Sequence, residues 1–334
     1  MVKKKSFKRK SKSERILLLV LVLTIVIMGI ARPAQFFTVN NFQSMVSQMP
    51  EFGILALAMM TIILTGGINL AVAMIASLSG IIAAFVLSSG LTQSNPILGI
   101  FLAFVVSIIS ALIMGVINGA FVSYIGVAAL LVTLGTSKLF EGIGLNLTKG
   151  GAVSGFPMEF MKIGNGKILG LPIPMLIYIV IIIISYILLE KTVWGKHLFL
   201  SGSNIMATEY SGVDVKWTVF KSYLFSACLS AMAGMIMISR YNSAKIDYGS
   251  SYLMQTVTAV VLGGTNIAGG EGSVAGTVIA VAIIQVIGTG LNIIGINRNI
   301  VDITIGAILI AVLAIKQISR MINDKKLIAQ KKVN

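Results

Sequence analysis

The sequence predicts an all-α, polytopic membrane protein with about ten transmembrane helices and both termini in the cytoplasm. Of its 334 residues, 56% are hydrophobic and only 11% are charged, and the mean hydropathy is +0.96. A soluble domain carries about 25% charged residues, so this chain has too few charges to cover a soluble globule. A disordered chain is also excluded, because disorder requires low hydrophobicity. At about 20 apolar residues a span, the length has room for about nine to eleven spans.

The charge pattern predicts which side of the membrane each loop occupies. The net charge is +15, from 26 Lys and Arg against 11 Asp and Glu. Most of the basic residues lie in three clusters, at 3–15, 191–221 and 316–332. Basic loops stay in the cytoplasm. The predicted parts are a basic cytoplasmic tail at 1–15, a transmembrane domain at 16–318 with a cytoplasmic loop at 190–218, and a basic cytoplasmic tail at 319–334.

The first five spans follow the apolar runs of the first half of the chain. Arg32 and Pro33 end the first run, two glycines interrupt the second, a polar turn follows the third, and a short connection precedes the fifth. The stretch before Gly66 is short for a full crossing and could be a broken or partly re-entrant helix. The predicted spans are 16–31, 52–65, 70–87, 97–117 and 127–145.

The second half of the chain provides the other five spans. A long loop rich in Gly and Pro, 146–171, comes first, and the polar loop 190–218 follows one span later. A second short stretch ends at two glycines, Gly263 and Gly264, and is also short for a full crossing. The predicted spans are 172–189, 219–239, 252–262, 273–294 and 300–315.

The two interrupted spans carry the same motif, G-G-x-N-[IL]-A, at 66–71 and 263–268. Glycine-interrupted segments in corresponding places of two halves indicate an internal repeat in a transporter. Backbone that leaves the helix at membrane depth survives inside protein or beside a water-filled path. The alternative, that these glycines only let helices pack closely, stays open. The predicted pathway residues are Gly66, Gly67, Asn69, Gly263, Gly264 and Asn266.

The span count makes both interrupted segments cross the membrane in the same direction. It therefore predicts two related halves in a parallel repeat, whereas an inverted repeat would need one span to be redrawn.

Few ionisable residues lie inside the predicted spans. Lys138 and Glu141 are three residues apart and Arg298 and Asp302 are four apart, so each pair can form on one helix face. Glu271 lies in the glycine-rich turn after Gly263. Such a thin series of acids argues against a proton-coupled carrier, although sodium coupling through backbone carbonyls stays open.

The sequence carries no signature of an enzyme. It has no G-x-x-x-x-G-K-[ST] phosphate loop, no H-E-x-x-H and no G-x-S-x-G, and its one His and one Cys cannot form a metal site. We therefore expect no catalytic residue, no metal and no cofactor. A nucleic-acid partner is not expected either, because no basic folded domain is present to read a groove.

The loop 190–218 contains one short capped helix. Ser203 or Asn204 can cap a helix over 205–210, and Gly212 can end it. On the basic side of a protein with few loops, this helix is typical of a docking element. A plain connector is the alternative.

Five motifs in order resemble one family. They are L-T-G-G-I-N-L-A-V at 64–72, V-T-L-G-T at 132–136, G-x-N-x-x-A-x-x-x-x-G at 202–212, V-V-L-G-G-T-N-I-A-G-G-E-G-S-V-A-G-T at 260–277 and G-L-N-I-I-G-I at 290–296. Together they resemble permease subunits of the ribose and simple-sugar branch of ATP-binding-cassette importers, over roughly residues 45–316.

The resemblance implies a mechanism and partners. Two permease subunits, in a homodimer or a heterodimer, would form the pathway in a bacterial cytoplasmic membrane, and a solute-binding protein would deliver a sugar or sugar-like solute from outside. Separate ATPase subunits would supply the energy, which fits the missing phosphate loop. They would dock on the coupling residues Gly202, Asn204, Ala207, Thr208 and Gly212.

The sequence departs from the family pattern at a few positions. Asn69 stands where the family usually has Asp, Ala71 where it has Ser, and Thr208 where it has a second Ala. The lost Asp leaves the solute open among ribose, galactose, xylose, autoinducer-2 and nucleosides. Two other classes remain as alternatives, an ion-coupled secondary transporter and a membrane scaffold or enzyme that transports nothing.

Overall fold

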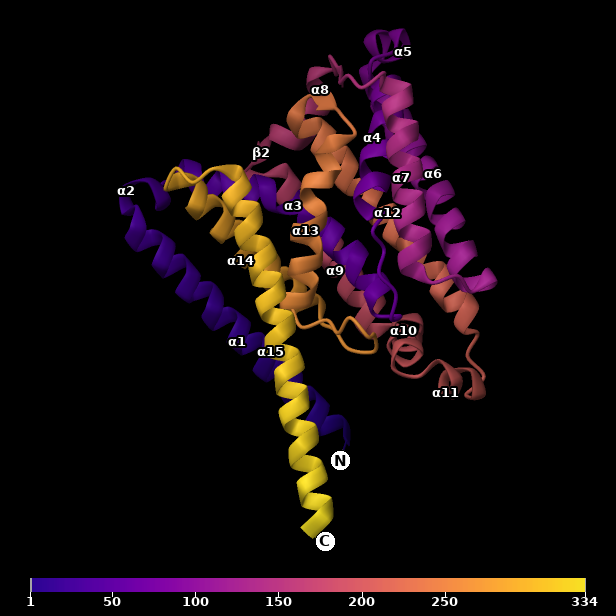
Figure 1. The fold of residues 1–334 in the computed structure, drawn as a ribbon. Coiled ribbons are helices and arrows are strands. Elements are labelled where there is room, and N and C mark those ends of the chain that lie inside the picture. Colours follow the sequence, from indigo (N-terminus) through magenta and orange to yellow (C-terminus); the bar gives the residue numbers. More distant parts are fainter. Residues whose placement is uncertain (1, 334) are drawn as a thin grey trace.

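A computed structural model describes the backbone of residues 2–333 and the side chains of residues 14–297, 299–315 and 318. The fold is all-α, as predicted, and a helix occupies each of the ten expected segments (Figure 1). These ten helices are α1 Val2–Ala31, α3 Val39–Ile63, α4 Val72–Leu87, α6 Pro96–Ala120, α7 Ala129–Thr148, α9 Ile173–Tyr186, α12 Val215–Tyr241, α13 Asp247–Leu262, α14 Val274–Ile293 and α15 Arg298–Val333.

Shorter elements join these helices. The short helices are α2 Pro33–Phe36, α5 Gly90–Ser94, α8 Met158–Asn165, α10 Val193–Ser203 and α11 Ile205–Tyr210, and two π-helical turns are η1 Phe121–Ile125 and η2 Ile187–Lys191. Four two-residue strands pair antiparallel, β1 Val153–Ser154 with β4 Ser243–Ala244 and β2 Lys167–Ile168 with β3 Leu171–Pro172.

Six segments among the described residues are long and apolar enough to cross a membrane. They are Glu14–Ala31, Val39–Ile63, Pro96–Ile125, Ile173–Lys191, Val215–Tyr241 and Val274–Ile293. Two shorter apolar helices, Val72–Leu87 and Asn299–Ile315, correspond to two further predicted spans. The protein is therefore a multi-pass membrane protein, while the number ten stays a prediction.

Four predicted boundaries change. The second helix begins at Val39 rather than at residue 52, so the stretch before Gly66 is 25 residues long and is not short. The expected connection 118–126 is helical up to Ile125. The loop 146–171 contains α8 and two strand pairs begin in it. Likewise α13 begins at Asp247, five residues before the predicted start of its span.

These differences share a physical cause. Hydropathy reports where a helix meets lipid, but polar residues such as those at 39–51 also form helix when an N-cap starts it. Here Thr38 provides that cap, and its side chain accepts a hydrogen bond from the Asn41 N–H at 3.2 Å. Polar and charged residues also form helix in the predicted tails, where α1 begins at Val2 and α15 ends at Val333.

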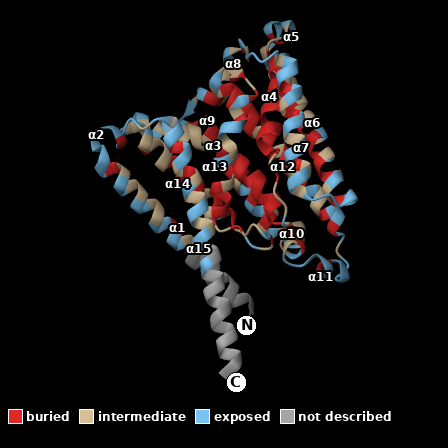
Figure 2. Ribbon diagram, viewed as in Figure 1, coloured by how far each residue is buried: buried red, intermediate tan, exposed pale blue. Residues whose placement is uncertain are grey.

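The core lies around two central helices, α3 and α12. In the most apolar 18-residue stretch of each helix, 83% of the residues of α3 and 78% of those of α12 are buried, against 11% of those of α1. Figure 2 shows the buried residues concentrated on α3, α12, α4 and α13, with α1 at the edge of the molecule. In Figure 1, α8 and α5 lie at one end of the helices, and α10 and α11 lie at the opposite end.

Candidate functional site

The two interrupted segments meet at the end of the molecule that carries α10 and α11. We name residues 64–71, between α3 and α4, break A, and residues 263–273, between α13 and α14, break B. The Gly270 N–H donates to the Leu64 carbonyl at 3.0 Å. α3 ends directly before this contact, and α13 ends at Leu262, at the start of break B. The parallel repeat stays a prediction.

Both breaks contain the same turn. In break A the Asn69 side-chain oxygen accepts from the Ala71 N–H at 3.0 Å. In break B the Asn266 side-chain oxygen accepts from the Ala268 N–H at 3.2 Å. The repeated motif therefore encodes a repeated local structure. The amide oxygens are engaged within these turns, and Asn69 is buried.

The four glycines fall into two kinds. Gly66 and Gly264 have φ angles of +86° and +97°, which L side chains rarely adopt. Gly67 and Gly263 lie in close contacts, since a Cβ at these positions would lie 3.1 Å from the Ala129 Cβ and 2.6 Å from the Thr277 Cα, respectively. Close packing therefore explains Gly263 without a solute.

Break A is held by α7 through Thr133, the threonine of the V-T-L-G-T motif. Its hydroxyl oxygen lies 3.0 Å from the Ile68 carbonyl and accepts from the Leu70 N–H at 3.1 Å. Thr133 itself is fully buried. The sequence identified this motif only through its resemblance, and the structure gives it a physical role, which is to satisfy backbone groups that break A leaves outside a helix.

The short helix predicted in the loop 190–218 is confirmed as α11, Ile205–Tyr210. We call this loop the coupling loop, after its predicted role. Asn204 caps it, because its side-chain oxygen accepts from the Ala207 N–H at 3.0 Å. The Thr208 hydroxyl donates to the Asn204 carbonyl at 2.7 Å, and Gly212 follows the helix with a φ of +79°. Ala207, Thr208 and Gly212 thus lie on or just after α11, on the far side of α10 from the two breaks (Figure 1).

Gly202, near the end of α10, contacts both breaks at once. A Cβ there would overlap the Leu64 carbonyl oxygen and lie 2.5 Å from the Gly270 nitrogen. From the other side, a Cβ on Gly269 would lie 2.7 Å from the Gly66 nitrogen and 2.9 Å from the Gly202 Cα. Two of the predicted site residues, Gly66 and Gly202, therefore lie close together, because both pack against Gly269. We call the contact of Leu64, Gly202 and Gly270 the coupling junction.

A buried ionic cluster lies toward the opposite end of the helices, where α8 packs on α12. Arg240 Nε lies 2.6 Å from Glu51 Oε1, and the Tyr252 hydroxyl donates to Glu51 Oε2. Tyr241 completes the cluster, donating to Glu51 Oε2 at 3.1 Å and lying 2.7 Å from the Tyr252 hydroxyl. The Glu51 side chain is fully buried.

This cluster joins α3 and α13, the helices that lead into the breaks, to α12, the helix that follows the coupling loop. Sequence analysis missed it because the apolar run seemed to start after Glu51. The sequence did hold a signal. Glu51 directly precedes the predicted span 52–65, and Arg240 directly follows the predicted span 219–239.

The first predicted intrahelical pair is present, with Lys138 Nζ 2.7 Å from Glu141 Oε2. The second pair cannot be assigned, since the Arg298 side chain lies outside the described residues. Glu271 is exposed, and its backbone carbonyl accepts from the Asn266 N–H at 2.9 Å, so here its main chain shapes break B.

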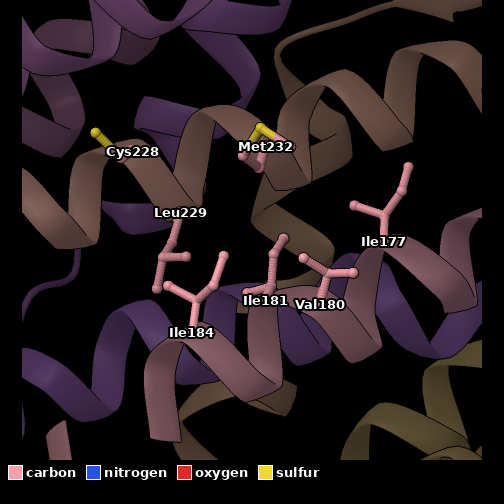
Figure 3. A pocket seen from close by; sticks show the side chains of 7 residues that line it. All are labelled: Ile177, Val180, Ile181, Ile184, Cys228, Leu229 and Met232. Carbon is pink, nitrogen blue, oxygen red and sulfur yellow. The ribbon is translucent and has the colours of Figure 1, made fainter. Parts of the chain in front are cut away.

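A cavity of about 350 Å³ lies between α9 and α12. Isoleucine and valine side chains of α9 and the side chains of Cys228, Leu229 and Met232 of α12 line it, and Figure 3 shows Leu229 pointing toward Ile184 of α9. Its lining is entirely apolar, so it offers no hydrogen bond to a polar solute.

The sequence matches the family model described as "Branched-chain amino acid transport system / permease component" over residues 41–313. It is also similar to curated proteins named "Autoinducer 2 import system permease protein LsrD". The relative from Yersinia pseudotuberculosis (strain IP 31758) is 33% identical over 90% of this chain and 89% of its own. Those from Escherichia coli (strain SMS-3-5 / SECEC) and Salmonella typhi are 33% and 31% identical, over 90% of both chains in each case. No solved structure matches significantly.

Proposed function

The chain belongs to the branched-chain amino acid transport system / permease component family and is a permease subunit of an importer, and from this we propose how its parts divide the work. The α11 end faces the cytoplasm, the coupling loop receives separate ATPase subunits, and the two breaks carry the resulting motion into the membrane. The coupling junction is the single observation that supports this division.

The junction supports the proposal because its backbone atoms are closely packed, with no space between α10 and the two breaks for even a Cβ at Gly202. The Gly202 backbone touches the Leu64 carbonyl and the Gly270 N–H directly, so a displacement of α10 displaces the ends of α3 and α13 together. Both helices end where a path across the membrane would open or close. One moving loop on the cytoplasmic side would thereby act on both halves of the repeat.

The surface of α11 fits a docking role. Met206 and Tyr210 are 67% and 90% exposed on this helix. Exposed apolar and aromatic side chains at a helix tip are typical of a protein interface. We assign to this surface the contact with an ATPase subunit, with Asn204, Ala207, Thr208 and Gly212 holding the shape of α11.

The remaining partners follow from the same family. The α8 end faces outward and receives a solute-binding protein, and a second permease subunit, identical or related, completes the pathway in a bacterial cytoplasmic membrane. The permease domain spans residues 16–318 between two basic cytoplasmic tails. Ten crossings place both tails and the loop 190–218 on the same side.

The solute is proposed to be sugar-like, because relatives at 31–33% identity carry autoinducer 2 in their names. Gly66, Gly67, Asn69, Gly263, Gly264 and Asn266 form the proposed lining of the pathway. Asn69 and Asn266 bring neutral amides rather than carboxylates to the two breaks. A neutral, hydroxyl-rich solute suits such a lining better than a cation does.

The test is the energy source of uptake. In proteoliposomes that hold the assembled transporter and its binding protein, we expect uptake that depends on ATP and survives collapse of the sodium and proton gradients. Uptake that persists without the ATPase and stops with either gradient would instead establish the ion-coupled carrier. The Asn204→Asp, Ala207→Arg double variant should abolish co-purification of the ATPase, and Ser203→Ala, which leaves the Asn204 cap intact, is the matched control.

A further inference from the structure

The cavity between α9 and α12, which we call the α9–α12 cavity, opens on the outside of the molecule. Two of its lining residues, Val180 and Ile184, are 54% and 45% exposed. Ile179, Ile183 and Ile187 continue this exposed surface of α9, and they are also aliphatic. Both walls belong to segments that are long and apolar enough to cross a membrane. The cavity therefore opens toward the acyl chains of the bilayer.

A single stripe of α12 reaches the surface beside this cavity. Cys228 and Met232 of the stripe line the cavity (Figure 3). Lys221 lies seven and eleven residues before them, so at about 100° a residue it lies within about 20° of both on the helix surface. Lys221 therefore stands on the same stripe. Between residues 221 and 239, the residues of α12 that are not buried are Lys221, Leu224, Phe225, Cys228 and Met232.

The length of this stripe matches one leaflet of a bilayer. An α-helix rises about 1.5 Å a residue, so Lys221 and Met232 are about 16 Å apart along α12. The hydrocarbon core of a bilayer is about 30 Å thick, and half of it is about 15 Å. With Lys221 at the level of the headgroups, the α9–α12 cavity lies in the acyl-chain region of the same leaflet.

The side chains around Lys221 support this depth. Lys221 Nζ lies 4.8 Å from the centroid of the Trp217 ring, and the Trp217 ring is stacked on Phe220 with 5.6 Å between centroids. The Phe220 ring in turn lies 5.5 Å from the ring of Tyr124 in η1. Tryptophan and tyrosine rings of this kind gather at the membrane–water interface, where one end of the ring is apolar and the other is wet.

The other wall of the cavity ends in a similar pair. Lys191 Nζ lies 5.2 Å from the centroid of the Tyr186 ring, directly after α9. Trp194 of α10 joins this end of α9 to α12, because its indole N–H donates to the Thr218 carbonyl at 3.3 Å and its ring lies 5.8 Å from the Phe225 ring. Both walls therefore carry a lysine held against an aromatic ring at the α11 end.

We propose that the α9–α12 cavity binds an acyl chain of an anionic phospholipid whose phosphate contacts Lys221. The lining of the cavity is entirely apolar, so it suits a hydrocarbon chain and not a polar solute. The Lys221 ammonium has three donors for phosphate oxygens, and lysines at the membrane surface attract anionic headgroups. The inference goes beyond the proposed transport function and does not depend on which solute is carried.

A lipid in this place contacts both helices that carry the coupling loop. The helix α9 leads into the loop through η2, and α12 follows the loop. An empty space between apolar side chains lacks the contacts that a hydrocarbon chain would supply. An acyl chain in the cavity therefore stabilises the packing of α9 on α12 at the two ends of the loop.

The test is photo-crosslinking in the assembled transporter, in vesicles. The probe is a trace of phosphatidylglycerol with a diazirine in one acyl chain, and peptide mapping by mass spectrometry locates the crosslinks. We expect crosslinks at the residues of α9 and α12 that line the cavity. Because one lysine near the surface favours an anionic lipid by about 5-fold, this labelling should fall about 5-fold when unlabelled phosphatidylglycerol replaces phosphatidylcholine in the vesicles.

The same sample contains an internal control. Ile113 on α6 is 57% exposed, and crosslinks there should not show this fall. Lys221→Gln should abolish the fall at the cavity. Lys196→Gln, which removes an exposed lysine from the coupling loop and changes the net charge equally, should keep it.

Three results would overturn the inference. If labelling of the cavity falls no more than labelling at Ile113, the cavity meets ordinary bilayer lipid without recognising the headgroup. If the cavity is labelled in the isolated subunit but not in the assembled transporter, another protein chain covers it. If Lys221→Gln keeps the parent preference, Lys221 does not contact the phosphate. The first two comparisons need only the parent chain, so they remain decisive where a variant fails to insert.

Discussion

At the scale of single residues, Glu51 is the charged residue with the least exposed side chain among those that the structure describes. It is fully buried in α3, and its carboxylate is matched by the Arg240 guanidinium and two tyrosine hydroxyls. A buried charge of this kind costs more when one partner is removed than when both are. The cluster therefore holds α3, α12 and α13 in one arrangement.

Replacing Arg240 alone should destabilise the protein strongly. Arg240→Met leaves the Glu51 carboxylate without its counter-ion, and we expect a loss of about 3–5 kcal/mol in the free energy of unfolding in detergent. Adding Glu51→Gln should restore much of that loss. Lys245→Met, which breaks an exposed pair with Asp247, is the control and should change little. If Arg240→Met and Lys245→Met lowered the free energy of unfolding equally, the buried pair would contribute no more to stability than the exposed one.

The glycines of the breaks should not tolerate large side chains. Gly264→Leu forces a leucine to a φ of +97°, and Gly67→Leu drives a side chain toward Ala129. We expect each to lose most uptake and about 1–3 kcal/mol of stability. Gly90→Leu is the control, because a Cβ at Gly90 has nothing within 4 Å. Intact transport in both break variants would exclude pathway lining and close packing alike.

At the scale of elements, the breaks are held by groups from other helices. Thr133 on α7 is the clearest case, since its hydroxyl lies within hydrogen-bond distance of two backbone groups of break A. Thr136, one turn further along α7, donates only to carbonyls of its own helix, at Val132 and Thr133. The two threonines thus form a matched pair that differs in whether break A is touched.

Thr133→Val should weaken the coupling between ATP hydrolysis and uptake, while Thr136→Val should not. Removing the hydroxyl leaves the Ile68 carbonyl and Leu70 N–H without this partner, at a cost of about 1–3 kcal/mol. The measurement is the amount of solute taken up for each ATP hydrolysed. A Thr133→Val transporter with the parent ratio would show that α7 does not support break A.

The helices also show which parts of the fold can be predicted from the sequence. Local signals predicted α11 with its correct ends, because Asn204 and Gly212 are a cap and a stop that act within a few residues. Hydropathy placed the start of α3 too late, since the polar half of that helix carries no apolar signal. The repeated Gly-Gly-x-Asn motif correctly indicated two related breaks in the helices.

Contacts between distant segments could not be predicted in this way. The coupling junction joins residues 64, 202 and 270, and the ionic cluster joins residues 51, 240 and 252, which no periodicity or spacing brings together. In both cases the residues themselves were ordinary, a glycine in a loop and charges at the ends of apolar runs. Only the packing of α12 and α13 on α3, and of Gly202 in α10 against the two breaks, gives them a role.

At the scale of the whole molecule, the two ends of the helix bundle have different tasks. Toward the α8 end, the ionic cluster fixes the three central helices to one another. At the α11 end, Gly202 fixes the coupling loop to both breaks. If α11 receives an ATPase as proposed, an input there would be transmitted to both breaks together, as alternating access in a repeat would require.

The most direct test of this account is the coupling ratio of Gly202→Ala in the reconstituted transporter. The added methyl group would overlap the Leu64 carbonyl and crowd the Gly270 nitrogen, while α11 and its cap remain unchanged. We predict that the variant still binds its ATPase and hydrolyses ATP but takes up far less solute per ATP than the parent, with Gly90→Ala behaving like the parent. A Gly202→Ala transporter that keeps the parent ratio would contradict the central claim that the coupling loop acts on the two breaks through this junction.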